Sequence, residues 1–309
     1  MEINSLAPIA LFVFNRLDHT RRTVAALQKN ILADQSDLII YSDGPKDTAE
    51  SRASVLAVRE YLTTIAGFKS VKIIEREKNF GLAQSIISGV SEVIAQSGKI
   101  IVLEDDMLSS RHFLEYMNEG LTNYQNDESV ISIHGYIYPV QKTLPETFFL
   151  KGADCWGWAT WQRGWELFEA DGQKLLDELI ARKSTQEFDF SGTQAYTQML
   201  RDQIAGKNNS WAIRWYASAF LKNKLTLYPG RSLISNIGFD NSGTHCGITD
   251  DFGTPEQVEN VKIDIKKIEI KEDSEAKQII SDFFRTQACA RSSWQSRLKR
   301  AIKKILAGR

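Results

Sequence analysis

Three consecutive acidic residues, Glu104, Asp105 and Asp106, directly follow an apolar run at residues 100–103. Adjacent carboxylates repel one another unless a cation or hydrogen-bond donors neutralise them. Their hard oxygen atoms suit Mg²⁺ or Mn²⁺, and either ion would bridge the protein to a diphosphate. The alternative is an ordinary solvated acidic turn. We favour the divalent-metal site, because the motif stands at the end of a strand-like segment.

Polar residues also follow two other apolar runs. Asn15 and Arg16 come after the run at residues 8–14, and Arg16 could contact a nucleobase or phosphates. Asp43 stands in a turn after residues 38–41, and its carboxylate could accept a hydrogen bond from a uracil or a ribose hydroxyl. An Asp-Gly-Pro turn is also ordinary loop chemistry. These residues are candidate contacts to a nucleotide.

Four of the seven tryptophans fall within ten residues, from Trp156 to Trp165. Trp156 and Trp158 could form a platform for a saccharide acceptor, since aromatic faces stack on the C–H faces of sugars. A packing corner in the core is the alternative. Asp154 precedes this cluster and could serve as a general base or bind a sugar hydroxyl.

A glycine-containing segment at residues 238–247 includes His245. Glycines here indicate a loop that could close over a bound ligand. His245 could bind the metal or contact a diphosphate, although a lone histidine in a loop more often does neither.

The elements that must position these residues alternate in type over residues 1–106. Apolar runs predict strands and helical spacing predicts the helices between them: strands at 8–14, 38–41, 71–74 and 99–103, helices at 20–30, 50–65 and 82–96. This alternation is typical of a doubly wound α/β fold, a mostly parallel sheet with helices on both faces. Ligands bind such sheets at the carboxyl ends of the strands, where the candidate residues stand.

The rest of the chain has a different pattern. We expect helices at 113–124, 175–203 with a break at 184–192, and 211–223, and strands at 130–134 and 225–228. The predicted organisation is one domain over residues 1–290, made of halves 1–106 and 107–290, followed by a tail at 291–309. The tail has apolar residues on one helical face and several basic ones, which favours an amphipathic helix on an anionic membrane. A docking helix or a solvated tail is the alternative.

Composition narrows the class of protein. The formal net charge of the 309 residues is -1, which argues against a dedicated nucleic-acid binder. Three cysteines in no zinc-binding pattern indicate reduced thiols and a cytoplasmic protein. We recognise no secretory signal at the start and no apolar run of the roughly 20 residues that span a bilayer.

Several segments carry a resemblance to a known family. They are Phe14-Asn-Arg16, Glu104-Asp-Asp-Met-Leu108 with Phe113-Leu-Glu-Tyr116, Phe148-Phe149 with Gly157-Trp158, and Ser242-Gly-Thr-His245. With these segments, between Ile9 and about Phe252, the chain resembles the N-acetylglucosaminyltransferase I-like family of GT-A glycosyltransferases. It is also similar to bacterial sugar transferases of surface-polysaccharide clusters. The resemblance implies a GT-A-type fold.

The resemblance also implies roles for single residues. Arg16 and Asp43 would hold the nucleoside, Glu104 and Asp105 would contact its base and ribose side, and Asp106 would be the direct metal ligand. His245 would belong to the loop that closes on the diphosphate. The family's catalytic base is an aspartate directly after a tryptophan, and here Ala212 follows Trp211. Asp154 is therefore the first candidate for the base and Glu166 the second.

Together these observations predict a glycosyltransferase that depends on Mn²⁺ or Mg²⁺. It would move a hexosyl or N-acetylhexosaminyl group from a nucleotide-sugar, which we expect to be a uridine diphosphate (UDP) sugar, to a saccharide acceptor. The expected setting is bacterial surface-polysaccharide synthesis on a lipid-linked acceptor, with the tail at the inner face of the cell membrane. A nucleotidyltransferase is a rival, but residues 12–16 lack the glycines of its signature loop. A carbohydrate-binding protein would leave the acidic motif unexplained.

Overall fold

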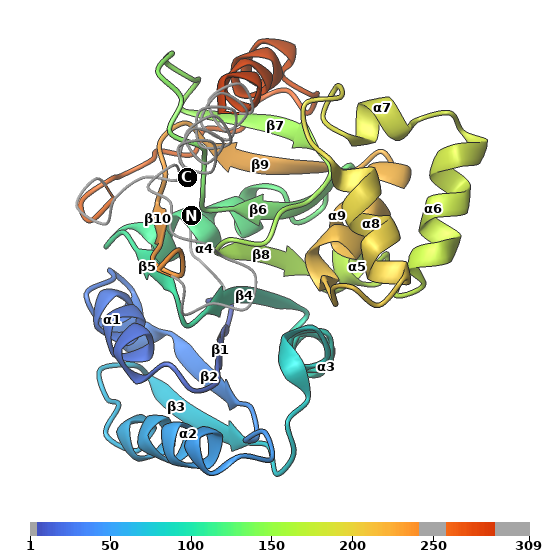
Figure 1. Cartoon of the computed structure of the whole chain (residues 1–309). Coiled ribbons are helices and arrows are strands. Elements are labelled where there is room, and N and C mark those ends of the chain that lie inside the picture. The colour runs from blue at the N-terminus through green and yellow to red at the C-terminus, as the bar shows by residue number, and fades with distance from the viewer. Residues whose placement is uncertain (1–4, 241–257, 288–309) are drawn as a thin grey trace, which may run out of the picture.

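The computed structural model describes residues 5–240 and 258–287. Within them, one sheet of eight strands has the order β3-β2-β1-β4-β8-β6-β9-β7. Figure 1 shows this order from β3 at the bottom to β7 at the top. Strands β8 and β7 run against their neighbours, and the other pairs are parallel. The strands are β1 Ile9–Val13, β2 Asp37–Ser42, β3 Ser70–Glu75, β4 Lys99–Glu104, β6 Val130–His134, β7 Thr147–Lys151, β8 Trp158–Trp161 and β9 Leu225–Pro229.

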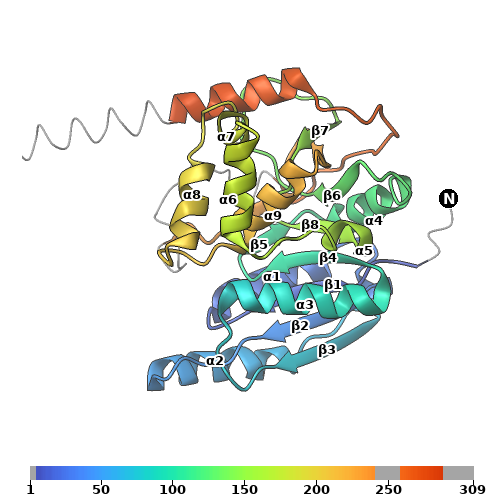
Figure 2. The same cartoon turned by 90° about the vertical axis from the view of Figure 1, so that its right-hand side faces the viewer.

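Helices cover both faces of this sheet because the central strands are apolar on both sides. In β1, Leu11 packs into one core and its neighbour Phe12 into another, as the two-residue period of a strand requires. The first core lies under α1 (Leu17–Gln28), α2 (Ala49–Leu62) and α4 (Phe113–Asn123). The second lies under α3 (Gly81–Ser97) and α9 (Trp211–Leu221), which stand in front of the sheet in Figure 2.

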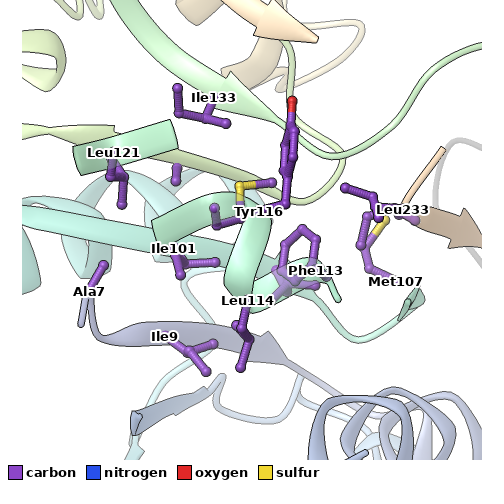
Figure 3. Packing of buried hydrophobic residues seen from close by; sticks show 14 of the residues in the cluster. Ala7, Ile9, Ile101, Met107, Phe113, Leu114, Tyr116, Leu121, Ile133 and Leu233 are labelled. Atoms are coloured by element: carbon purple, nitrogen blue, oxygen red, sulfur yellow. The ribbon is translucent and has the colours of Figure 1, made fainter. Parts of the chain in front are cut away.

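The first core is continuous around α4. Figure 3 shows Leu114 of α4 beside Ile9 of β1, and Phe113 of the same helix on the side of Met107, which follows the acidic motif. All four side chains are fully buried. Burial of a side chain of this size stabilises the fold by about 1.5–3 kcal/mol, so this contact fixes α4 against the strands that end at the acidic motif.

Smaller elements complete the second half. A two-stranded sheet pairs β5 (Met107–Ser109) with β10 (Ile234–Asn236), and α5 (Gln162–Trp165), α6 (Gly172–Ala181), α7 (Thr185–Phe188) and α8 (Tyr196–Ile204) follow β8. A further helix over residues 274–287 packs on β7 and β9 through Ile280 and Phe284. It is the helix at the top of Figure 2. No helix in residues 5–240 and 258–287 is long and apolar enough to cross a membrane.

The predicted fold class is confirmed as a mixed, mostly parallel α/β sheet with helices on both faces. The region predicted as helical at 175–203, with a break at 184–192, contains three helices: α6 ends at Ala181, the short α7 falls within the predicted break, and turns at residues 189–195 precede α8. Strands β5, β7, β8 and β10 and the helix at 274–287 were not expected. The predicted tail at 291–309 lies outside the described residues, and the division at residues 106 and 290 stays a prediction.

Candidate functional site

The candidate residues of the first half gather at one edge of the sheet. Strands β1, β2 and β4 are parallel, with Val13 beside Ser42 and Phe12 beside Glu104. The residues that follow these strand ends therefore leave the sheet side by side. This brings together Asn15, Arg16, Asp43, Glu104, Asp105 and Asp106, as the sequence predicts.

Arg16 is the direct link between β1 and the acidic motif. Its guanidinium Nη2 donates to the carboxylate of Asp105 and, over 2.8 Å, to Oδ2 of Asp106. Arg16 stands just before α1, and Thr23 of that helix donates to the carbonyl oxygen of Asp105 (2.8 Å). From the sequence we expect Arg16 to contact a ligand. In the structure, Arg16 is instead the internal counter-ion of the Asp105 and Asp106 carboxylates. Asn15 beside it is exposed.

The acidic motif has unusual electrostatics. Burial and the negative charges of Asp106 and Asp105 raise the pKa of Glu104 to about 8. Burial also raises the pKa of Asp105, although the charge of Arg16 opposes this change. For Arg16, burial alone would lower the pKa, but the charges of Asp105 and Asp106 outweigh it and raise the pKa. One cation thus neutralises only part of the motif, and a further cation would be favourable here.

Two carboxylate oxygens of the motif are free to bind such a cation. Asp105 Oδ2 and Asp106 Oδ1 are buried and have no hydrogen-bond partner within the described part of the chain. Buried polar atoms are nearly always paired, so these oxygens fit a metal ion. Within residues 5–240 and 258–287 no cluster of three metal-ligating side chains occurs. A site of one or two carboxylates is nonetheless typical of Mg²⁺ or Mn²⁺ that is also bound by phosphates.

The carboxylate of Asp43 accepts several hydrogen bonds from backbone N–H groups, a structural role that is not evident from the sequence. Its Oδ1 accepts hydrogen bonds from the backbone N–H groups of Gly44 and Phe80, each 2.9 Å long. Its Oδ2 accepts from Gly81 N (2.9 Å) and from the side chain of Asn79 (3.1 Å). The carboxylate therefore ties the end of β2 to the first turn of α3, where a negative charge is favoured. Contact between Asp43 and a nucleoside stays a prediction.

The loop between β7 and β8 contributes the second half of the site. Gly152 N donates to Lys224 O (3.0 Å), and Gly157 O accepts from Gly135 N (2.7 Å), so both loop ends are fixed. Both glycines have positive φ values, 100° and 63°, which other residues rarely adopt. Since β8 enters the sheet with Trp158 beside Val102 of β4, this loop lies at the same edge as the acidic motif.

Asp154 stands in the middle of this loop. Its side chain is 29% exposed, and it lines a cavity of about 510 Å³ that is mostly bounded by aromatic and aliphatic side chains. The negative charges of Asp154, Glu104 and Asp106 all contribute to a raised pKa of Cys155, although burial is the main cause. Cys155 therefore lies within the electrostatic influence of both Asp154 and the acidic motif.

The two predicted platform tryptophans have different environments. Trp158 is 0% exposed and packs against Trp165, Trp211 and Trp215 in the second core, so its face is not available to a saccharide. Trp156 is only partly buried and lies edge-on to Phe239, with ring centroids 5.5 Å apart. Trp156 also lines the cavity beside Asp154. Burial excludes Trp158 as a platform for the acceptor, and Trp156 remains the candidate.

Glu166, the second candidate for the base, is not brought to this edge. Strand β8 runs antiparallel to β4, and its last residue, Trp161, lies beside Lys99 at the start of β4. Glu166 follows α5 beyond that point, so it lies toward the end of β4 opposite the acidic motif. It accepts a hydrogen bond from Gln162 (2.8 Å) at the surface. His245 lies outside the described residues.

Comparison with known proteins gives the family. A sequence model described as glycosyl transferase family 2 matches residues 9–179, more than half of the chain. The chain belongs to glycosyl transferase family 2. No curated protein matches its sequence significantly.

Two solved structures show limited similarity to this family 2 glycosyltransferase. One is the mannosyltransferase PcManGT from Pyrobaculum calidifontis, in complex with GDP-mannose and Mn²⁺, at 14% identity and a TM-score of 0.34. The match covers 44% of this chain and 37% of that one. The other is TarS from S. aureus, at 12% identity and a TM-score of 0.31, covering 47% of this chain and 24% of that one. The chain thus matches well under half the length of either protein.

Of two further residues at the candidate site, we name Gly238 from the sequence only as part of the segment at 238–247, and we do not name His134 as a site residue. Gly238 lies against Asp106, and Ile237 N donates to Asp106 O (2.9 Å), so the segment after β10 returns to the acidic motif. His134, at the end of β6, faces Asp154. Its position at a strand end on the carboxyl edge was a usable signal, whereas the approach of Gly238 depends on a pairing of β5 with β10 that the sequence does not reveal.

Proposed function

We propose that the protein is a metal-dependent inverting or retaining sugar transferase of the N-acetylglucosaminyltransferase I-like kind. It would move a hexosyl or N-acetylhexosaminyl group from a UDP-sugar to a saccharide hydroxyl. The observation that carries this proposal is a pair of buried oxygens on Asp105 and Asp106, beside Arg16, that have no hydrogen-bond partner in residues 5–240 and 258–287. Bacterial surface-polysaccharide synthesis on a lipid-linked acceptor is the setting we infer from the family resemblance.

The residues at the carboxyl edge divide the work on the donor. Asp106, with Asp105, would hold Mn²⁺ or Mg²⁺, and the ion would neutralise charge that develops on the departing diphosphate. Glu104 and Asp105 would contact the nucleoside, together with Arg16 and Asn15. Asp43 would support this surface by fixing the start of α3. His245, as the resemblance implies, would act near the diphosphate.

Asp154 would act on the acceptor. In the transfer, an acceptor hydroxyl oxygen forms a bond to the anomeric carbon while the bond from that carbon to the diphosphate breaks. An inverting reaction needs a base that accepts the hydroxyl proton, and Asp154 is partly exposed and lines a cavity with Cys155 and Trp156. Trp156, in the same cavity, would stack on the acceptor sugar.

Binding measurements test the donor site. In Asp106→Asn we expect Mn²⁺-dependent UDP binding, measured by calorimetry, to weaken at least tenfold while the melting temperature changes little. The matched control is Asp18→Asn, a nearby aspartate whose side chain is 80% exposed and which contacts only Arg22 at 3.8 Å among the described residues. A near-normal Mn²⁺-dependent affinity for UDP in Asp106→Asn would reject the assignment of Asp106 to the metal site.

A cytoplasmic location with peripheral contact to the membrane is part of the proposal. The sequence of residues 291–309 combines apolar residues with several lysines and arginines, and about 1 kcal/mol per basic residue is available at an anionic surface. Deleting residues 293–309 should reduce co-sedimentation with liposomes that contain anionic lipid. Unchanged sedimentation would reject the membrane contact and leave the donor site unaffected.

A further inference from the structure

His134 is a buried histidine whose ring nitrogens lack hydrogen-bond partners in the described part of the chain. It ends β6, its side chain is 0% exposed, and its ring lies 5.0 Å from that of Tyr228 and 6.4 Å from that of Tyr136. Leaving a buried polar group unpaired costs about 1–3 kcal/mol. A phenylalanine or leucine would fill the space without this cost, so the imidazole calls for a chemical reason.

The nearest charged group is Asp154. His134 Nε2 lies 3.7 Å from Asp154 Oδ2. The other carboxylate oxygen, Oδ1, already accepts a hydrogen bond from Cys155 N (2.8 Å). One oxygen is therefore held by the loop backbone, while the second faces the imidazole at slightly more than hydrogen-bond distance. Such distances commonly shorten when a substrate is bound.

The imidazole is well suited to donate one hydrogen bond and carry no charge. Burial lowers the pKa of His134, although the charge of Asp154 opposes this change. A neutral ring has one N–H, which can point from Nε2 toward the carboxylate.

Several other titratable groups surround Asp154, contributed by the loops and by β7, β9, α8 and α9. They are Tyr136, Tyr138, Tyr196, Tyr216, Tyr228, Cys155 and Lys151.

We propose that His134 is a positioning residue for Asp154, donating Nε2–H to Oδ2 and so directing the carboxylate toward the acceptor hydroxyl in the cavity. This inference rests on the proposed role of Asp154 as the base. The hydrogen bond holds Oδ2 in one orientation, so the carboxylate is in place when an acceptor hydroxyl enters the cavity.

Three variants test the inference. His134→Met removes the donor at similar volume, His134→Gln keeps an amide N–H near the position of Nε2, and Asp154→Asn removes the base. His112→Met is the control, because His112 contacts Glu115 on α4 (2.7 Å) and has no part in the site. For each, kcat and KM for transfer from a UDP-sugar are measured from pH 5 to 9, with Mn²⁺-dependent UDP affinity as the check on folding and donor binding.

We expect His134→Met to lower kcat about 10- to 100-fold, the scale of a misplaced catalytic group. UDP affinity should stay at the wild-type value. His134→Gln should recover most of kcat, and His112→Met should match the wild type. Asp154→Asn should lose about 10²- to 10⁴-fold in kcat, the usual contribution of a general base.

Other results would overturn the inference in distinguishable ways. A wild-type kcat in His134→Met, with Asp154→Asn inactive, would reject His134 and leave Asp154 in place. Equal losses in His134→Met and His134→Gln together with weakened UDP binding would mean a structural role only. An active Asp154→Asn would reject the base, and with it the positioning role, without affecting the metal and donor site.

Discussion

Gly238 lies so close to Asp106 that a Cβ atom at position 238 would stand 2.3 Å from Asp106 Oδ2. The same oxygen accepts the hydrogen bond from Arg16. The backbone of residue 238 therefore forms one wall around the carboxylate that we assign to the metal. A side chain at this position must displace either the carboxylate or the segment that follows β10.

We predict that Gly238→Ala weakens Mn²⁺-dependent UDP binding at least tenfold, because the added methyl group moves Asp106. Calorimetric titration measures the affinity. Gly206→Ala is the control: Gly206 has a φ of 71°, and nothing lies within 4 Å of a Cβ there. That variant should lose about 1 kcal/mol of stability through backbone strain and no affinity. Equal affinity in the two variants would contradict the assignment of Asp106.

The first half of the fold was predictable because buried parallel strands have continuous apolar sequences. Once β1, β2 and β4 are recognised, their parallel pairing brings Arg16 and Asp105 to one edge, although 89 residues separate them. The sequence did not reveal that the two side chains would pair with each other. An arginine beside three acids can face a ligand or the acids, and only the geometry distinguishes these arrangements.

The second half of the fold was harder to predict from the sequence because its helices and strands depend on tertiary contacts. The segment around Trp158 is a short strand buried on both faces, and its composition is equally compatible with an exposed aromatic platform. Glu166 and Asp154 are both acids near tryptophans, but the reversed direction of β8 sends one to each end of the sheet. A strand's direction is set by its partners, so no local pattern could distinguish the two candidates.

Asp43 gives a prediction about stability. Replacement by Asn substitutes an NH₂ group for one oxygen, and each Asp43 oxygen now accepts two hydrogen bonds. At least one buried N–H group then faces a donor. We expect Asp43→Asn to lower the free energy of unfolding by about 2–4 kcal/mol, measured by urea denaturation. Amide hydrogen exchange in the first turn of α3 should accelerate.

Asp47→Asn is the matched control for Asp43, because the Asp47 side chain is fully exposed and pairs only with Arg52 among the described residues. Its effect on stability should be under about 1 kcal/mol, as for surface ion pairs. If Asp43→Asn keeps full stability and only weakens UDP binding, the carboxylate is a nucleoside ligand and not an anchor of α3.

His134 makes stability depend on pH in a defined direction. Burial lowers its pKa below the ordinary value of 6.5, against the opposing charge of Asp154, so below pH 6.5 the unfolded chain binds a proton that the folded chain does not. The free energy of unfolding therefore falls as the pH falls from about 6.5, by at most about 1.4 kcal/mol per pH unit.

The variant His134→Gln tests this dependence, because its side chain cannot take up this proton. Urea denaturation at pH 7.5 and 5.5 should show a smaller loss of stability in His134→Gln than in the wild type. His112→Gln provides the comparison for a histidine outside the site, at the N-cap of α4. If the wild type and His134→Gln lose equal stability on acidification, the ring of His134 is protonated in the folded protein, and it then faces Asp154 as a cation rather than as a neutral donor.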